Sequence, residues 1–162
     1  MAPTTTNGTA VVTMPSDTTI QITREFNAPR HLVFRAWTTP ELITRWWAGD
    51  RGEVTAVEVD LRPGGTWRYV MRANGGFEVA FRGEYSEVVP GERIVSTEIF
   101  EAMPDKVAES TVTFTEENGR TTVTILVRHE SQEDRDMHIN SGMEQGMQSS
   151  LDHLEQVAVS LR

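Results

Sequence analysis

The stretch that decides the fold is the end of the chain, residues 142–154, which reads Gly-Met-Glu-Gln-Gly-Met-Gln-Ser-Ser-Leu-Asp-His-Leu. Its apolar residues recur at helical spacing and continue beyond it as one stripe. Gly142 and Gly146 flank the stripe, although a glycine inside a helix costs about 1 kcal/mol relative to alanine. The spacing predicts a helix over 132–161 whose glycines either allow close packing or leave space open. The stripe comprises Met143, Met147, Leu151, Leu154, Ala158 and Leu161.

The start of this helix and the segments before it also follow from the sequence. Ser131 with Asp134 three residues on resembles a capping box. Two short helices are expected after the first strand, beginning near Pro29 and Pro40, because proline suits a first helical turn. Asn74-Gly75 and Asn118-Gly119 are typical hairpin turns. Alternating apolar and polar residues predict strands over 18–26, 53–61, 66–73, 76–89, 92–101, 109–117 and 120–130.

Tight turns between consecutive strands favour an antiparallel sheet, and the alternation indicates one covered face. Only the C-terminal helix is long enough to cover that face. We therefore predict an α+β helix-grip fold, in which a curved antiparallel sheet of six to seven strands wraps around a long C-terminal helix. Residues 1–17 are expected to be a disordered tail, and 18–162 a single domain.

Composition narrows the classes of partner and compartment. The 162 residues carry a formal net charge of −9. This charge argues against a nucleic-acid partner and against an anionic membrane surface. The N-terminal segment lacks the basic and apolar regions of a secretory signal. There is no cysteine, which excludes disulfides and thiolate sites. Together these features predict a cytoplasmic protein.

Several motifs together resemble the SRPBCC superfamily, which shares its fold with START lipid-binding domains and birch-pollen-allergen-like proteins. Within it the chain is similar to homologues of the activator of the heat-shock-protein-90 ATPase. The motifs are Phe26-Asn27-Ala28-Pro29, Val33-Phe34-Arg35-Ala36-Trp37-Thr38, Pro40-Glu41-Leu42 with Trp46-Trp47, Asp60-Leu61-Arg62-Pro63-Gly64-Gly65, Gly83-Glu84-Tyr85 with Val88-Val89-Pro90, and the closing Gly-Met-x-x-Gly-Met-x-x-Ser-Leu.

This resemblance implies a range of functions. The superfamily includes ligand carriers, aromatic cyclases and dehydratases, and resistance proteins, and the family name points to stress response and a chaperone contact. Chaperone activators proper carry an additional N-terminal domain, which residues 1–17 cannot supply. The usual closing motif has Trp after each Gly, whereas this chain has Met143 and Met147. Methionine at these positions would make a cavity more plastic.

No catalytic or metal-binding constellation is identifiable from the sequence. The four histidines lack the spacing of metal ligands, and the glycine pairs lack the residues of a phosphate loop. We therefore expect no metal and no cofactor. Asp134 and His138 are four residues apart and could pair across one helical turn, which would stabilise the helix. Glu98 lies on a strand with apolar residues on both faces, so the pattern leaves its orientation open. An inward Glu98 is a candidate acid or base.

The remaining signal is an aromatic-rich interior that we predict to be a pocket for a small hydrophobic or aromatic molecule. A single helix on a large curved sheet leaves space, and tyrosine and tryptophan carry polar tips that orient a ligand. Two alternatives stay open, namely a cyclase- or hydrolase-type enzyme and a chaperone co-factor. The protein is expected to be a monomer or weak dimer. The predicted ligand-binding residues are Trp67, Tyr69, Met71, Phe81, Tyr85, Glu98, Met143 and Met147.

Overall fold

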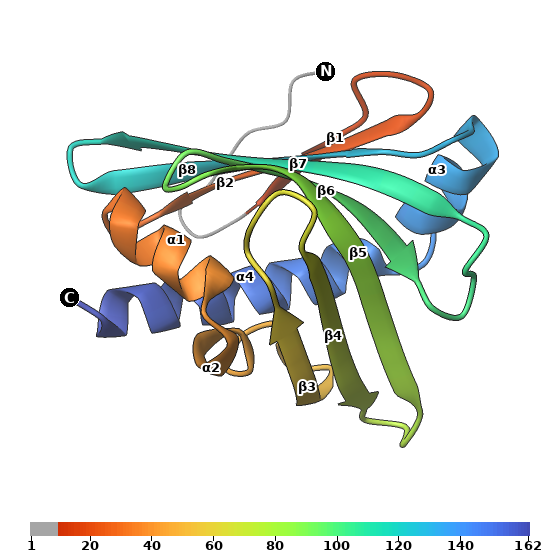
Figure 1. Cartoon of the computed structure of the whole chain (residues 1–162), viewed down its shortest axis with the longest axis horizontal. Coiled ribbons are helices and arrows are strands. Elements are labelled where there is room, and N and C mark those ends of the chain that lie inside the picture. Colours follow the sequence, from red (N-terminus) through yellow and green to blue (C-terminus); the bar gives the residue numbers. More distant parts are fainter. Residues whose placement is uncertain (1–9) are drawn as a thin grey trace.

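The protein is one curved antiparallel sheet with helices on its concave side (Figure 1). The computed structural model describes residues 10–162. The strands lie in the order β1-β2-β8-β7-β6-β5-β4-β3, and each pairs antiparallel with its neighbours. The strands are β1 (Val11–Thr13), β2 (Thr19–Phe26), β3 (Gly52–Val59), β4 (Thr66–Ala73), β5 (Glu78–Val89), β6 (Arg93–Phe100), β7 (Val107–Glu117) and β8 (Arg120–Arg128).

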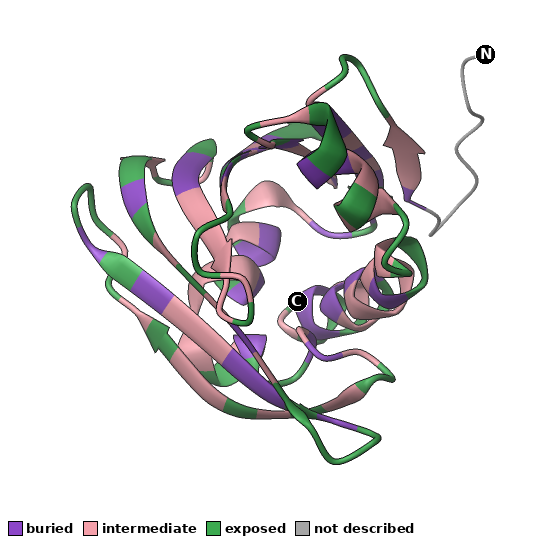
Figure 2. Ribbon diagram, turned by 90° about the vertical axis from the view of Figure 1, so that its right-hand side faces the viewer, coloured by how far each residue is buried: buried purple, intermediate pink, exposed green. Residues whose placement is uncertain are grey.

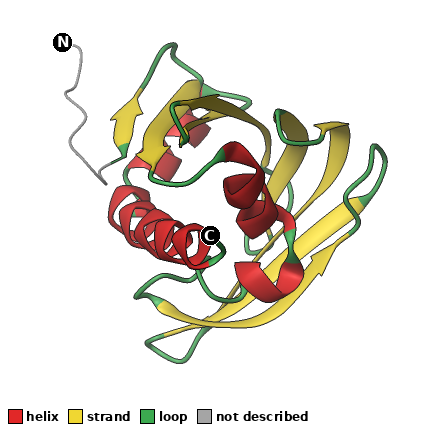
Figure 3. Ribbon diagram, turned by 90° about the vertical axis from the view of Figure 1, so that its left-hand side faces the viewer, coloured by secondary structure: helices red, strands yellow, loops and turns green. Residues whose placement is uncertain are grey.

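Four helices complete the fold. They are α1 (Arg30–Thr38), α2 (Pro40–Ile43), α3 (Gln132–Ile139) and α4 (Met143–Ser160). The helix α4 lies within the curve of the sheet, and buried residues occur on both (Figures 2 and 3). This arrangement confirms the predicted helix-grip fold, with eight strands instead of six or seven.

The additional strand is β1, which falls inside the segment predicted as a tail. Val11–Thr13 pair with β2, and the backbone of Ala10 exchanges two hydrogen bonds with the side-chain amide of Gln148. The two N···O distances are 2.9 and 2.7 Å. Ala10 and Gln148 are far apart in the sequence, so the local sequence pattern does not predict the hydrogen bonds between them. The rest of the predicted tail, residues 1–9, lies outside the described residues.

The prediction of one helix over 132–161 is wrong, because the chain breaks between α3 and α4. Gly142 adopts φ +84°, a left-handed conformation that glycine takes without steric cost. It therefore precedes α4 instead of lying inside it. The predicted start of α3 is confirmed, since the N–H of Asp134 donates to the hydroxyl of Ser131 over 3.0 Å.

A buried arginine fastens α4 to the sheet. Arg24 lies on β2 and is 1% exposed. Its guanidinium donates to Asp152 at 2.6 Å and to Glu155 at 3.2 Å, both on α4. Burying a cation is costly unless it is paired, so these two carboxylates fix the position of α4 against β2. The helix α1 packs against α4 and also contacts β7 and β8.

Candidate functional site between the sheet and helix α4

The predicted aromatic residues come together on the face of the sheet turned toward α4, which we call the inner face. Trp67 and Tyr69 alternate along β4, and their ring centroids are 4.9 Å apart. Tyr69 lies opposite Phe81 on β5, which stacks on Phe100 of β6 at 5.1 Å. These rings form one continuous apolar wall across three strands.

Trp47 closes this wall from the other side. It lies in the turns that follow α2, and its ring meets Tyr69 edge-on at 5.4 Å and Phe81 at 5.9 Å. The hydroxyl of Ser150 on α4 donates to the Trp47 carbonyl over 2.7 Å. The sequence analysis includes Trp47 only in a family motif and not among the predicted ligand-binding residues. The motif Trp46-Trp47 gave no sign that the second ring reaches the sheet.

The methionines of the closing motif lie on the opposite wall. Met143 and Met147 are partly buried on α4 and pack against the same core, and Met71 is buried on the inner face of β4. Among the described elements, α1 has the closest backbone approach to α4, and the strands lie farther from it. The distance between α4 and the strands is therefore spanned by side chains.

Gly146 serves a contact instead of leaving an opening toward the sheet. A Cβ at this position would collide with the guanidinium of Arg51, which crosses the helix there. Gly142, by contrast, has open space around it and is needed for its backbone conformation. The sequence analysis offered close packing or open space as the role of the two glycines. The structure supports close packing at Gly146, whereas Gly142 has neither role.

A second feature of the inner face is a row of polar groups beside Gly83. Trp67 pairs with Gly83 across β4 and β5, and the pairing of Arg82 with Ile99 brings Gly83 beside Glu98 on β6. A Cβ on Gly83 would lie 2.6 Å from Nε1 of Trp67 and would collide with the carbonyl oxygen of Thr97 on β6. The glycine therefore makes room for the indole edge beside β6. Glu98 lies two residues before Phe100, on the same face of β6, and Phe100 stacks on Phe81 of the inner face. Glu98 therefore faces inward, an orientation that the sequence left open.

These polar groups have no partners within the described part of the chain. Trp67 is 8% exposed, and its Nε1 is buried without a hydrogen-bond acceptor. Across residues 10–162 the carboxylate of Glu98 makes neither a hydrogen bond nor an ion pair. Tyr85 and Ser96, which face each other across β5 and β6, are both buried. Buried polar groups in proteins are nearly always satisfied by protein, water or ligand.

Burial also changes the acidity of these groups. It raises the pKa of Glu98 to about 6. It raises the pKa of Tyr69 far above its ordinary value, and the nearby charges of Tyr85 and Glu98 add to this effect. Burial, followed by the charge of Asp60, also raises the pKa of Tyr85. Glu98 and Tyr69 are deep in the protein, yet both retain accessible surface.

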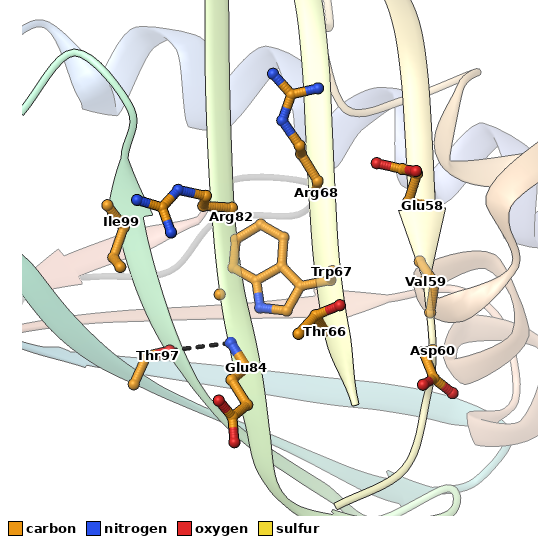
Figure 4. Close-up of a pocket in the computed structure, with 11 residues that line it drawn as sticks. Glu58, Val59, Asp60, Thr66, Trp67, Arg68, Arg82, Glu84, Thr97 and Ile99 are labelled. Atoms are coloured by element: carbon orange, nitrogen blue, oxygen red, sulfur yellow. Dashed lines mark hydrogen bonds between the residues drawn. The ribbon is translucent and has the colours of Figure 1, made fainter. Parts of the chain in front are cut away.

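The outer face of the sheet carries a groove of about 450 Å³, whose lining includes Trp67 and Gly83 of the candidate site (Figure 4). Two arginines of this groove are held by a carboxylate beside it. Arg68 donates to Glu101 at 2.7 and 3.0 Å, and Arg82 approaches the same carboxylate at 3.8 Å. Because the groove is open and both of its arginines are already paired, we place the candidate site on the inner face. The lining of the groove comprises Glu58, Val59, Asp60, Thr66, Trp67, Arg68, Arg82, Gly83, Glu84, Thr97 and Ile99.

The histidines form a pair that the sequence did not predict. Nε2 of His129 and Nδ1 of His138 are 2.9 Å apart. Burial lowers the pKa of both, and that of His138 falls to about 4. The pairing that the spacing of Asp134 and His138 allows does not form, because Asp134 pairs with Lys106 at 3.0 Å. Within residues 10–162 no cluster of three or more side chains could hold a metal ion.

A sheet curved around a C-terminal helix, with aromatic and polar side chains on the face turned toward the helix, defines the helix-grip fold. Residues 27–158 match the family model described as Activator of Hsp90 ATPase homolog 1-like protein. The chain belongs to this family, and so to the SRPBCC superfamily that its motifs resemble. The curated proteins give no match.

Solved structures share the fold over nearly the whole chain. A protein from Rhodobacter sphaeroides is 21% identical with a TM-score of 0.86, and the match covers 93% of this chain and 99% of that one. Protein Ms6760 from Mycobacterium smegmatis is 26% identical with a TM-score of 0.82, covering 91% and 96%. A protein from Staphylococcus epidermidis is 27% identical with a TM-score of 0.78, covering 92% and 94%. Among the described helices of this chain, none has the length and hydropathy to span a membrane.

Proposed function

We propose that the protein binds a small hydrophobic or aromatic molecule between the inner face of the sheet and α4. The observation that carries this proposal is the set of unpartnered polar groups at Trp67 and Glu98, deep in the interior and surrounded by aromatic rings. A plain core would leave these groups unsatisfied at a cost of about 1–3 kcal/mol each. A bound molecule, or water that a molecule displaces, removes that cost.

The walls fit such a molecule. Trp47, Phe81 and Phe100 supply flat apolar surface, and aromatic surfaces bind aromatic ligands by offset and edge-on contacts. Met143 and Met147 supply flexible side chains on the other wall. Mostly apolar pockets with a few polar groups are typical of small-molecule sites.

The test is a titration of the purified protein with N-phenyl-1-naphthylamine, a neutral probe whose fluorescence rises in apolar surroundings. The probe should bind, and Phe81→Trp should weaken it because the larger ring occupies the site. The matched control is Phe77→Trp, at a side chain that is 62% exposed in the turn between β4 and β5. Native mass spectrometry of freshly purified protein would identify a molecule that is retained. A protein that binds neither the probe nor any small molecule contradicts the proposal.

Glu98 favours a second candidate, an enzyme of the cyclase or hydrolase type acting on the bound molecule. Its pKa of about 6 lies close to neutral pH, where a carboxyl can both give and take a proton. Turnover of the bound compound, lost in Glu98→Gln with binding kept, would distinguish an enzyme from a carrier. The chaperone co-factor alternative stays a prediction. The exposed large hydrophobic residues Met14, Phe77, Met137 and Val159 are scattered over different elements.

A further inference from the structure

The polar groups around Gly83 are specific enough to say which chemistry the ligand carries. We infer that the ligand presents one neutral hydroxyl, of the phenol or alcohol class, to a subsite formed by Nε1 of Trp67 and the carboxylate of Glu98. This inference rests on the proposed function. It adds the orientation of the molecule, with the hydroxyl at Gly83 and the apolar body toward Phe81.

The geometry supplies one fixed donor and one acceptor on the two strands beside Gly83. An indole N–H only donates, and an ionised carboxylate only accepts. Trp67 and Glu98 lie on β4 and β6, on either side of Gly83, and the missing side chain of Gly83 makes room for the edge of the Trp67 indole. Nε1 of Trp67 has no acceptor in the described structure, so the two groups do not satisfy each other. A group between them must accept from one and donate to the other.

A hydroxyl meets both demands with a single oxygen, as water does, whereas several common ligand groups meet only one of them. A carboxylate or phosphate would face the negative charge of Glu98. An ammonium group offers Glu98 its protons but has no lone pair for the indole N–H. An ether or ketone has no proton for Glu98. A ligand hydroxyl thus leaves neither side unpaired.

The surroundings of the subsite favour a neutral ligand as well. The inner-face arginine Arg24 is already paired with Asp152 and Glu155 at the far side of the sheet. Arg68 and Arg82 lie on the outer face, where Glu101 holds them. Within residues 10–162 no cation pairs with Glu98, so nothing in the subsite would neutralise an anionic ligand.

The remaining polar groups near Trp67 and Glu98 are hydroxyls, which can either donate or accept a hydrogen bond. Tyr85 and Ser96 are both buried, with 6% and 8% of their surface exposed. Neither side chain has a hydrogen-bond partner among the described residues. A hydroxyl rotates to donate or accept as its neighbour requires. These two side chains can complete the coordination of a ligand oxygen without fixing its identity.

The test compares four naphthalenes of similar size by isothermal titration at pH 8. They are 2-naphthol, 2-methoxynaphthalene, 2-methylnaphthalene and 2-naphthoate. We expect 2-naphthol to bind about tenfold or more tighter than 2-methylnaphthalene, because hydrogen bonds to charged groups are among the stronger ones in proteins. The methoxy compound should fall between them, since it accepts from Trp67 but cannot donate to Glu98. The naphthoate should bind weakest.

Two substitutions place the effect at the subsite. Glu98→Gln should reduce the advantage of 2-naphthol over 2-methoxynaphthalene to about threefold or less, because a neutral acceptor forms a weaker bond. Trp67→Phe should reduce the advantage of 2-methoxynaphthalene over 2-methylnaphthalene and gives an independent reading if Glu98→Gln does not fold. Glu84→Gln, on the outer face of β5, is the matched control and should change neither ratio.

The outcomes separate this inference from the function on which it rests. Equal binding of 2-naphthol and 2-methylnaphthalene, or tightest binding of the naphthoate, overturns the hydroxyl subsite and leaves the apolar pocket in place. A preference for 2-naphthol that survives both Glu98→Gln and Trp67→Phe also overturns it. Failure of all four compounds to bind, together with failure of N-phenyl-1-naphthylamine, removes the proposed function and this inference together.

Discussion

Replacing Glu98 with glutamine should stabilise the protein at neutral pH. Burial raises the pKa of this carboxyl from 4.5 to about 6, and each pKa unit corresponds to about 1.36 kcal/mol. Charging Glu98 in the folded state therefore costs about 2 kcal/mol more than in the unfolded chain. The carboxylate keeps part of its surface accessible, so we expect a measured gain of about 1–2 kcal/mol for Glu98→Gln at pH 7.

The effect has a defined dependence on pH. Between pH 4.5 and 6 the folded protein holds a proton on Glu98 that the unfolded chain has released. Folding is then favoured by low pH, and the contribution of Glu98 to stability is lost as the pH rises through about 6. The gain from Glu98→Gln should accordingly be near zero at pH 4 and reach its full size above pH 7.

The assay is urea unfolding of the two proteins at matched pH values from 4 to 8, followed by tryptophan fluorescence. The difference between the two unfolding free energies isolates Glu98, because every other titrating group is common to both. The outer-face variant Glu84→Gln should show no such pH-dependent gain. A Glu98→Gln protein that is less stable at pH 7 than the parent, with a constant difference at all pH values, would refute the assignment of Glu98 as a buried, unpaired carboxylate.

Two further predictions concern α4. Met147→Trp should narrow the space between helix and sheet and weaken N-phenyl-1-naphthylamine binding about tenfold, whereas Met137→Trp on the exposed side of α3 should leave it unchanged. Asp152→Asn combined with Glu155→Gln should lower the free energy of unfolding by about 3–5 kcal/mol, measured by urea titration, because Arg24 becomes an unpaired buried cation. A loss below about 1 kcal/mol would show that Arg24 does not fasten the helix.

The sheet was largely predictable from the sequence because its signals are local. Alternation along the strands and turns such as Asn118-Gly119 gave seven of the strands to within a few residues. The eighth, β1, depends on the side chain of Gln148 in α4, which no local pattern reveals. A short edge strand held by such a contact becomes visible only once the fold is known.

The break before α4 had a signal that the apolar stripe concealed. Asn140-Ser141-Gly142 is a run of residues that end helices, and Gly142 takes the positive φ that makes this possible. The apolar residues that follow this run recur at helical spacing, which favoured the prediction of one continuous helix. Gly146 is different, because it stays helical and gives room to Arg51. The sequence alone does not distinguish the two glycines. In the structure, Gly142 ends the helical path before α4 and Gly146 makes room for a side chain.

The candidate site was partly predictable for a related reason. Strand alternation correctly placed Trp67, Tyr69 and Phe81 on one face. It could not orient Glu98, because β6 carries apolar residues on both faces and so has no polar side to define the register. It could not place Trp47, whose position is set by the turns after α2 and by Ser150 on a distant helix.

The central claim, that a small molecule binds between the sheet and α4, is tested most directly by the methyl NMR signals of the seven methionines. The protein is labelled at the methionine methyl groups and titrated with 2-naphthol. The account predicts that the signals of Met71, Met143 and Met147 shift together and saturate at one concentration, while those of Met103 and Met137 stay in place. Saturable shifts at Met103 or Met137 with none at the three inner methionines would contradict it.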